Sequence, residues 1–445
     1  MYQDTVAAIS TPLGEGGIGI VRLSGKEAYS IAEVIFRGKL SDRRLSYGHI
    51  IDPETTEIVD EVLVSYMAAP HTYTREDVVE INCHSGPAPL QRVLQLTLRH
   101  GARLAHPGEF TLRAFLNGRI DLAQAESVLD IVHARTEVSL RLAVQGLEGR
   151  FSAAIKAIRS KLMSVLAYLT ARIDFPEDEI EPQEVVPPLE EALQSLQKLI
   201  ASADAGMVYR LGVRTAIVGR PNVGKSSLLN RLLREDRSIV TSVPGTTRDT
   251  IEEVANIHGV PFILVDTAGI IRSKDLVESL GVERSQRAIE QADLVLAVID
   301  VSQPIKKADT EILDLIGEKT ALTVANKSDL PHQARLEELG REVVFSSALS
   351  SEGITELEKR MVTMVLGGKV LVSDAPVVNN PRHKDALERA ARSLGQALRA
   401  IDAGMPDDLI TIDLTVALDA LGEITGETIH GDLLETIFSN FCIGK

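Results

Sequence analysis

The spacing of apolar residues divides the chain into three kinds of sequence. In residues 1–118, β-branched runs such as IGIVRLSG and DVVEINCHSG alternate with glycine turns, and one stretch, LQRVLQLTLRHG, has helical spacing. This mixture predicts a small α+β domain. In residues 119–210, apolar residues recur every three or four positions, as in VSLRLAVQGLEGRFSAAIKAIRSKLMSVLAYL, which is typical of packed helices. FPEDEIEPQEVVPP interrupts that pattern with prolines and acids, so we expect a solvated loop there.

A different pattern follows in residues 211–370. Apolar strands such as VRTAIVG, VPFILVDTAG and DLVLAVIDV alternate with helical stretches such as SSLLNRLLRED. Alternation of this kind predicts a doubly wound, parallel α/β sheet. Residues 371–445 have helical spacing again, as in KDALERAARSLGQALRAID and LTVALDALGEI. We therefore predict a multidomain chain in which an α/β domain is inserted between the two parts of an all-α domain.

Composition and charge narrow the class of protein. The chain has 445 residues, of which 44% are apolar and 25% charged, as in a folded protein of several domains. No apolar run reaches the roughly 18 residues needed to cross a bilayer, and the start MYQDTVAAIS lacks a signal-peptide pattern, so we expect a cytoplasmic protein without a membrane partner. Its two cysteines, Cys83 and Cys442, match no metal-site spacing and argue against a disulfide framework. A net charge of −16 argues against nonspecific coating of nucleic acid.

The strongest chemical signal is GRPNVGKS, residues 219–226. It fits the pattern G-x-x-x-x-G-K-[ST] of a phosphate-binding loop, follows an apolar strand and leads into a helix. Its glycines allow backbone N–H groups to turn towards phosphate oxygens, Lys225 supplies a positive charge, and the Ser226 hydroxyl can bind Mg²⁺. The sequence therefore predicts a site for a nucleoside triphosphate.

Three later segments indicate which base is bound. FILVDTAG places Asp266 at the end of a strand, where a carboxylate can hold the Mg²⁺ water shell, with Gly269 close to the γ-phosphate. NKSD, residues 326–329, follows the strand ALTV, and an acid there can accept hydrogen bonds from two N–H donors of guanine. SSAL, residues 346–349, lies where a backbone contact to the base is expected. Together these motifs resemble the GTPase domain of the translation-factor class, which implies GTP as the ligand.

Two departures from the small-GTPase pattern affect the mechanism. The residue after DTAG is Ile270, whose alkyl side chain cannot orient an attacking water as a glutamine does. The phosphate loop carries Asn222, and TSVPGTTRD, residues 241–249, is rich in oxygen donors. Such oxygens can hold a monovalent cation beside the phosphates, and the same residues also suit an ordinary turn.

These stretches are similar to the potassium-activated GTPases, and essentially the whole chain resembles the MnmE (TrmE) family of tRNA modification GTPases. The resemblance implies that Glu278, which follows the DTAG loop, positions the attacking water in place of the missing glutamine. It implies K⁺ ligands at Asn222, Thr241, Val243 and Thr246, and Mg²⁺ ligands at Ser226 and Thr247. The expected GTP contacts are Asn222, Val223, Gly224, Lys225, Ser226, Ser227, Thr241, Ser242, Val243, Pro244, Gly245, Thr246, Thr247, Asp266, Thr267, Ala268, Gly269, Asn326, Lys327, Asp329, Ser347, Ala348 and Leu349.

The N-terminal domain carries a second candidate site. GEGGIG, residues 14–19, has the spelling of a dinucleotide-binding turn, but the strand-like IVRLSG follows it where a helix would be needed, so we expect a glycine turn between strands. By the resemblance, this domain is similar to tetrahydrofolate-binding domains and pairs with a second copy to form a homodimer. The implied folate contacts are Arg22, Glu80, Arg119 and Lys445. A carboxylate suits the donor-rich pterin edge, and cations suit the carboxylates of the folate tail.

The two cysteines lead to different expectations. Cys83 lies in a predicted strand, so we interpret it as a small packed residue without chemistry. Cys442 lies in NFCIGK at the end of the chain, which resembles the C-terminal signature of the family and implies a tail that reaches towards the folate pocket. Cys442 is therefore a candidate catalytic residue, and whether its thiol does covalent work stays open.

The resemblance implies one reaction for the whole chain. With a flavin-dependent partner of the MnmG (GidA) type that carries FAD, the family installs an aminomethyl or carboxymethylaminomethyl group on C5 of the wobble uridine (position 34) of certain tRNAs. A 5,10-methylene- or 5-formyltetrahydrofolate supplies the one-carbon unit, and GTP hydrolysis drives opening and closing of paired GTPase domains. The alternative is a regulatory GTPase switch that acts on RNA or ribosomes without one-carbon chemistry. The two hypotheses differ in whether the N-terminal domain binds folate.

Overall fold

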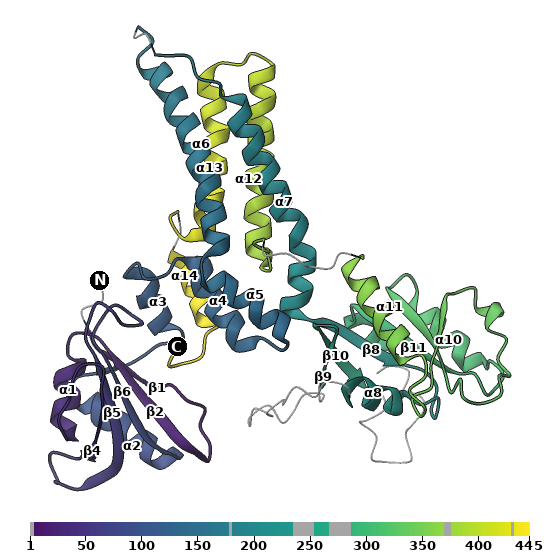
Figure 1. Cartoon of the computed structure of the whole chain (residues 1–445), viewed down its shortest axis with the longest axis horizontal. Coiled ribbons are helices and arrows are strands. Elements are labelled where there is room, and N and C mark those ends of the chain that lie inside the picture. The colour runs from purple at the N-terminus through teal and green to yellow at the C-terminus, as the bar shows by residue number, and fades with distance from the viewer. Residues whose placement is uncertain (1–3, 178–179, 235–252, 267–285, 369–374, 429–430) are drawn as a thin grey trace. The chain divides into compact units, whose positions relative to one another are not determined.

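The computed structural model describes residues 4–177, 180–234, 253–266, 286–368, 375–428 and 431–445 (Figure 1). The chain forms two compact units. The first unit comprises Met1–Leu129, Leu147–Ile155 and Asp419–Lys445, and the second comprises Asp130–Gly146 and Lys156–Leu418. The C-terminal residues therefore fold with the N-terminal ones. The boundaries predicted for the four sequence segments stay predictions.

The first unit is built on a seven-stranded sheet with the order β3-β4-β5-β6-β2-β1-β7. The strands are β1 Val6–Ile9, β2 Gly16–Ser24, β3 Phe36–Arg37, β4 Leu45–Ile51, β5 Ile58–Met67, β6 Val78–Ser85 and β7 Arg103–Leu104. Neighbouring strands are antiparallel except for β1 and β7, which pair in parallel. GEGGIG lies between β1 and β2 only at Gly14 and Glu15, because Gly16–Gly19 are already the first residues of β2. The predicted glycine turn between strands is therefore wrong for those four residues.

Side chains alternate between the two faces of this sheet. One face packs against helices α1 (Ala28–Ile35) and α2 (Pro87–Arg99), and its core includes alternate residues of β2 and β6 such as Val21 and Ile81. On the opposite face, β1 packs against Phe110 of helix α3 (Glu109–Leu116). This second face is the one that positions the candidate folate ligands, because Arg22 and Glu80 alternate with the core residues.

The C-terminal segment completes the first unit. Helix α14 (Gly431–Ser439) packs against α3, and Phe438 and Phe441 are buried in one apolar cluster with Ala114. Leu122 and Ala125, from the start of helix α4 (Leu122–His133), belong to the same cluster. The residues after Phe441 therefore leave a well-packed anchor within this unit.

Helices α6, α7, α12 and α13 run alongside one another (Figure 1). Their bounds, with that of the shorter α5, are α5 Glu137–Leu147, α6 Arg150–Asp174, α7 Val186–Leu211, α12 Pro381–Asp402 and α13 Asp407–Thr425. The predicted helical spacing is confirmed on both sides of the inserted domain. The prediction of a loop for FPEDEIEPQEVVPP is wrong for its last three residues, because α7 begins at Val186. Pro187 and Pro188 lie in the first turn of α7, where a missing N–H costs no hydrogen bond.

The α/β part of the second unit is a six-stranded sheet with the order β13-β12-β11-β8-β10-β9. All neighbours pair in parallel except β9, which is antiparallel to β10, so the predicted doubly wound sheet is confirmed. Its strands are β8 Val213–Val218, β9 Glu253–Ile257, β10 Val260–Asp266, β11 Leu294–Asp300, β12 Ala321–Asn326 and β13 Val343–Phe345. Its helices, with one 3₁₀ turn, are α8 Lys225–Arg234, α10 Lys307–Ile316, η1 Leu336–Leu339 and α11 Ile354–Leu366.

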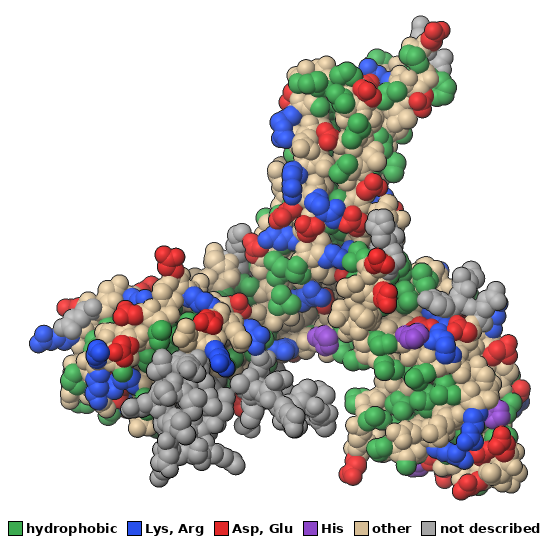
Figure 2. Space-filling view, turned by 180° about the vertical axis from the view of Figure 1, so that it is seen from behind, with side chains coloured by type: hydrophobic (Ala, Val, Ile, Leu, Met, Phe, Trp, Pro, Cys, Tyr) green, Lys and Arg blue, Asp and Glu red, His purple; other side chains and the backbone are tan. Residues whose placement is uncertain are grey.

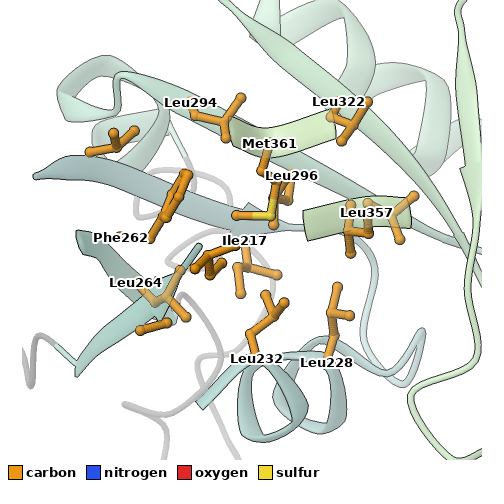
Figure 3. Close-up of a cluster of buried hydrophobic side chains, with 14 of the residues drawn as sticks. Ile217, Leu228, Leu232, Phe262, Leu264, Leu294, Leu296, Leu322, Leu357 and Met361 are labelled. Carbon is orange, nitrogen blue, oxygen red and sulfur yellow. The ribbon is translucent and has the colours of Figure 1, made fainter. Parts of the chain in front are cut away.

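Helices cover both faces of this sheet. One face packs against α8 and α11, where Leu228, Leu232, Leu357 and Met361 meet strand residues such as Leu296 (Figure 3). The other face packs against α10 through Leu313 and Ile316. Such two-sided burial explains why the strands read as continuous apolar runs rather than alternating ones. It also leaves the ends of the strands as the place where polar side chains can gather.

Hydrogen bonds within the second unit fix the two segments that connect the α/β part to the helices. Where the chain returns, Val378 N–H donates to Ser202 Oγ on α7 at 3.1 Å. Asp130 accepts from Arg210 Nε at 2.6 Å and from Asn379 Nδ2 at 3.3 Å. One carboxylate thus contacts the segment that enters the α/β part and the segment that leaves it. In the described part of the chain, no helix has both the length and the apolarity to cross a bilayer.

Candidate functional site

The phosphate loop lies between β8 and α8, as its sequence predicts. Gly224 has φ 99°, and a Cβ there would collide with the side-chain amide of Asn326, so only glycine fits. Lys225 is the first residue of α8 and is buried, and its Nζ donates to the carbonyls of Gly219 at 2.7 Å and Arg220 at 2.8 Å. The ammonium is therefore held inside the loop at the N-terminus of a helix, which is an arrangement that binds phosphate.

Ser226 and Ser227 follow in the first turn of α8 and are exposed. A hydroxyl at this position beside a lysine ammonium is the donor set that a magnesium–phosphate group needs. Asp266 is the last residue of β10, which pairs with β8, so its backbone reaches the same edge of the sheet. These residues fit a nucleoside triphosphate with Mg²⁺.

One buried side chain brings three of the predicted segments together. Asn326 ends β12 and is 2% exposed. Its Nδ2 donates to the Val223 carbonyl of the phosphate loop at 2.8 Å, and its Oδ1 accepts from Ala348 N–H of SSAL at 3.1 Å. Ser347 is fully buried and accepts from Ser350 N–H through its Oγ at 3.1 Å. Asn326 therefore locks the phosphate loop, NKSD and SSAL into one assembly.

The residues next to Asn326 and Ser347 differ in direction, because Lys327 turns towards the phosphate loop whereas Asp329 and Leu349 are exposed. Lys327 Nζ donates to the Asn222 carbonyl at 2.9 Å, which is a second link between NKSD and the phosphate loop. Asp329 is exposed beyond the end of β12, and Leu349 is 86% exposed. A carboxylate placed beside a buried anchor is available to a ligand such as the guanine edge.

Several predicted contacts lie outside the described residues. They are Thr241, Ser242, Val243, Pro244, Gly245, Thr246, Thr247, Thr267, Ala268, Gly269, Glu278 and the side chain of Asp266. The predictions of a K⁺ site, of Thr247 on Mg²⁺ and of Glu278 as the residue that positions water therefore stay predictions.

Sequence reasoning missed two buried acids beside the phosphate loop. Asp300, at the end of β11, accepts from Lys327 Nζ at 2.6 Å, and Asp309 accepts from Arg220 Nε at 2.6 Å. Burial alone would raise the pKa of the Asp300 carboxyl, but hydrogen bonds from Lys327 and Ser302 outweigh burial and hold that pKa below its usual value. The available signal was an acid ending the otherwise apolar strand LVLAVID.

A second constellation lies in the first unit on the face opposite α1 and α2. Arg22 and Glu80 are directly opposite in the pairing of β2 with β6, and Arg22 Nε donates to Glu80 Oε1 at 2.8 Å. The Arg22 guanidinium lies 5.6 Å from the centroid of the Phe110 ring. Both partners remain about one quarter exposed, at 23% and 24% of their side chains, so the pair is oriented yet accessible.

The C-terminal tail meets this pair. Arg22 Nη1 donates to the Gly444 carbonyl at 3.1 Å, although the two residues are 422 positions apart. Gly444 has φ 93°, and a Cβ there would lie 2.5 Å from the Ile9 carbonyl, so the tail needs glycine to fit against β1. Gly108 N–H donates to the Cys442 carbonyl at 3.4 Å, as does Lys445 N–H at 3.3 Å. The backbone of the tail is therefore fixed while the Cys442 side chain is exposed.

Arg119 and Cys83 complete the comparison with the predicted residues. Arg119 is exposed, and its guanidinium lies 4.7 Å from the ring centroid of Tyr73, which packs against the cluster that contains Phe110. Cys83 is buried in the sheet core, as predicted, and burial raises its pKa to about 12. Its thiol therefore stays protonated at neutral pH and is unsuited to nucleophilic chemistry.

Comparisons with known proteins cover the whole chain. Residues 5–119 match the family model described as "GTP-binding protein TrmE N-terminus", and residues 122–442 match the model "MnmE helical domain". A relative from Chloroflexus aurantiacus is 53% identical over 457 residues, with 100% of each chain covered. Another from Geobacillus kaustophilus is 48% identical over 458 residues, with 99% of each covered, and one from Roseiflexus sp. is 50% identical over 462 residues with full coverage. All three relatives carry the name "tRNA modification GTPase MnmE", and at this identity and coverage the chain belongs to the MnmE family of tRNA modification GTPases.

Proposed function

We propose that this chain is a K⁺-activated GTPase that modifies C5 of the wobble uridine of certain tRNAs. It acts with a flavin-dependent partner of the MnmG type, which carries FAD, and it uses a one-carbon unit from a tetrahydrofolate. The observation that carries the proposal is the hydrogen bond from Arg22 to Gly444, because it brings the tail with exposed Cys442 onto the strand of the candidate folate ligands. Family membership supports the GTPase and the tRNA substrate.

The folate part of the proposal follows from the charges on the second face of the first sheet. Glu80 offers carboxylate oxygens to the N–H donors of a pterin, and Arg22 orients that carboxylate from the neighbouring strand. Arg119 and Lys445 supply cations for the carboxylates of the folate tail. Two aromatic rings, Tyr73 and Phe110, lie beneath the arginines and offer flat apolar surface. The folate supplies the one-carbon unit when bound.

The GTPase part follows from the assembly around Asn326. Lys225 places its charge on the phosphates, Ser226 and Thr247 hold Mg²⁺, and Asp329 accepts hydrogen bonds from guanine. Asn222, Thr241, Val243 and Thr246 would hold K⁺, which would supply the positive charge that an arginine finger supplies elsewhere. Glu278 positions the attacking water. Asn222 is exposed in the phosphate loop with φ 65°, and this placement supports its role as a K⁺ ligand.

A homodimer belongs to the proposal. Leu45, Tyr47 and Leu63 lie on the face of the first sheet that α1 and α2 leave uncovered, with 65%, 64% and 40% of their surfaces exposed. An apolar sheet face of this kind is suited to burial against a second copy of the domain. Among the side chains drawn in colour in Figure 2, basic and acidic groups are interspersed on the visible face, so the proposal assigns part of the tRNA contact to the partner.

Deletion of the gene should remove the aminomethyl-type group from wobble uridines. Mass spectrometry of nucleosides from purified tRNA should show loss of the modified uridine, its return with the intact gene, and no return with Lys225→Ala, because phosphate binding needs that ammonium. Cys442→Ser should restore the nucleoside if the placement of the tail matters and the sulfur does not. An unchanged nucleoside profile in the deletion strain, together with GTP hydrolysis by the purified wild-type protein, would instead support the regulatory switch.

Potassium should accelerate GTP hydrolysis. At equal ionic strength, we expect hydrolysis in KCl to exceed that in NaCl by roughly tenfold or more, since the cation stabilises charge in the transition state. Asn222→Ala should abolish this difference, and Glu278→Ala should lower the rate in both salts with nucleotide affinity retained. Asn230→Ala, on the exposed surface of α8, is the matched control and should behave as wild type. Equal rates in the two salts would contradict the K⁺ proposal.

Arg22 and Glu80 should determine folate affinity. Calorimetric titration with 5-formyltetrahydrofolate should show binding that is weaker by about tenfold in Arg22→Ala and in Glu80→Ala, because each loses charge-assisted hydrogen bonds. Arg92→Ala is the control, since it removes an arginine–carboxylate pair with Asp52 at 2.7 Å in the same unit. A wild-type protein that ignores this folate would overturn the one-carbon proposal and favour the switch.

Charge on the uncovered sheet face should break the dimer. Leu63→Arg places a cation at the proposed interface, and light scattering after gel filtration should then give a mass close to one chain rather than two. Leu315→Arg, on α10, has the same 40% exposure and should leave the dimer mass unchanged. A wild-type protein with the mass of one chain would refute this part of the proposal.

A further inference from the structure

Asp300 occupies a place between the two loops that contact the nucleotide. It is the last residue of β11, which pairs with β8 on one side and with β12 on the other, and it lies opposite Asn326 in the register. The phosphate loop follows β8 and NKSD follows β12. Because parallel strands end at the same edge of the sheet, the Asp300 carboxylate lies between these loops.

The carboxylate is buried and fully engaged. It is 2% exposed and accepts from Lys327 Nζ at 2.6 Å, from Ser302 Oγ at 2.6 Å and from Ser302 N–H at 3.0 Å. A buried carboxylate is tolerated only when such partners replace the lost water. The hydroxyl and the amide belong to the turn after β11, so Lys327 is its charged partner.

The ammonium group of Lys327 donates to two acceptors. The same Nζ that pairs with Asp300 also donates to the Asn222 carbonyl at 2.9 Å, so the side chain spans from NKSD to the phosphate loop. Lysine has a flexible four-carbon stem, and one weak carbonyl contact would leave it free to turn into solvent. The ion pair with Asp300 selects the conformation that reaches the loop.

We propose that Asp300 is a positioning residue for guanine-nucleotide binding, which acts by holding Lys327 across the gap between NKSD and the phosphate loop. The inference rests on the proposed placement of GTP against these two loops. Without the carboxylate, Lys327 releases Asn222, and the two loops remain linked through Asn326 alone among the contacts of the described residues. The bound nucleotide then escapes faster, because both of its contact surfaces fluctuate more.

The test is a double-mutant cycle that follows release of fluorescent N-methylanthraniloyl-GDP by stopped flow. We expect release to be about tenfold faster in Asp300→Ala and about threefold faster in Asp300→Asn, which keeps the shape and an acceptor but not the charge. In a Lys327→Ala background, the change at Asp300 should alter the rate by less than about twofold. Asp293→Ala is the control, because that carboxylate lies just before the other end of β11 and accepts from Arg214 N–H at 2.9 Å.

Different outcomes test the role of Asp300 and the placement of GTP. Thermal melting without nucleotide identifies any variant that does not fold. If Asp300→Ala does not fold, the release rate of Asp300→Asn tests the inference. Unchanged release in both Asp300 variants, or equal effects of Asp300→Asn with and without Lys327, would overturn the positioning role while leaving the GTPase intact. A wild-type chain that binds no guanine nucleotide would overturn the placement of GTP itself.

Discussion

The nucleotide site depends on the burial of one amide, that of Asn326. The interior of the α/β part is apolar on both faces of its sheet, so a polar side chain can be buried there only at the strand ends and only with its hydrogen bonds satisfied. Asn326 meets that condition by donating to the phosphate loop and accepting from SSAL. A loop that moved away would leave a buried amide unpaired, which costs about 1–3 kcal/mol. The three loops therefore keep their mutual positions before any ligand binds.

A different constraint organises the first unit. Its sheet buries one face under α1 and α2, and on the other face a charged pair, Arg22 and Glu80, lies beside the ring of Phe110. The tail reaches this pair because Phe438 and Phe441 anchor the last helix, and because a glycine at 444 fits where a side chain would not. The candidate ligand site thus combines strands of the N-terminal sheet with the last residues of the chain. Folding of the whole unit is needed to complete it.

Sequence reasoning succeeded where a pattern is local. Helical spacing, the strand–loop–helix context of GRPNVGKS and the packed nature of Cys83 all depend on neighbours in the chain, and the structure bears them out. It erred at Val186, because proline ends a helix in its interior yet suits its first turn. It missed Asp300 and Asp309, because their partners, Lys327 and Arg220, lie 27 and 89 positions away in the sequence. No spacing rule relates Arg22 to Gly444.

Helix α7 links the nucleotide site to the helices. Ala205 and Tyr209 of α7 are buried in the same core as the strands and α8, and the Tyr209 carbonyl accepts from Ser139 Oγ on α5 at 2.6 Å. The returning chain binds the same helix at Ser202. Separating α7 from the sheet would expose apolar surface to water, which costs about 25 cal/mol of free energy per Å². It would also break these hydrogen bonds. A rearrangement of the sheet that follows nucleotide state must therefore carry α7 with it, since a packed core shifts between discrete arrangements rather than stretching.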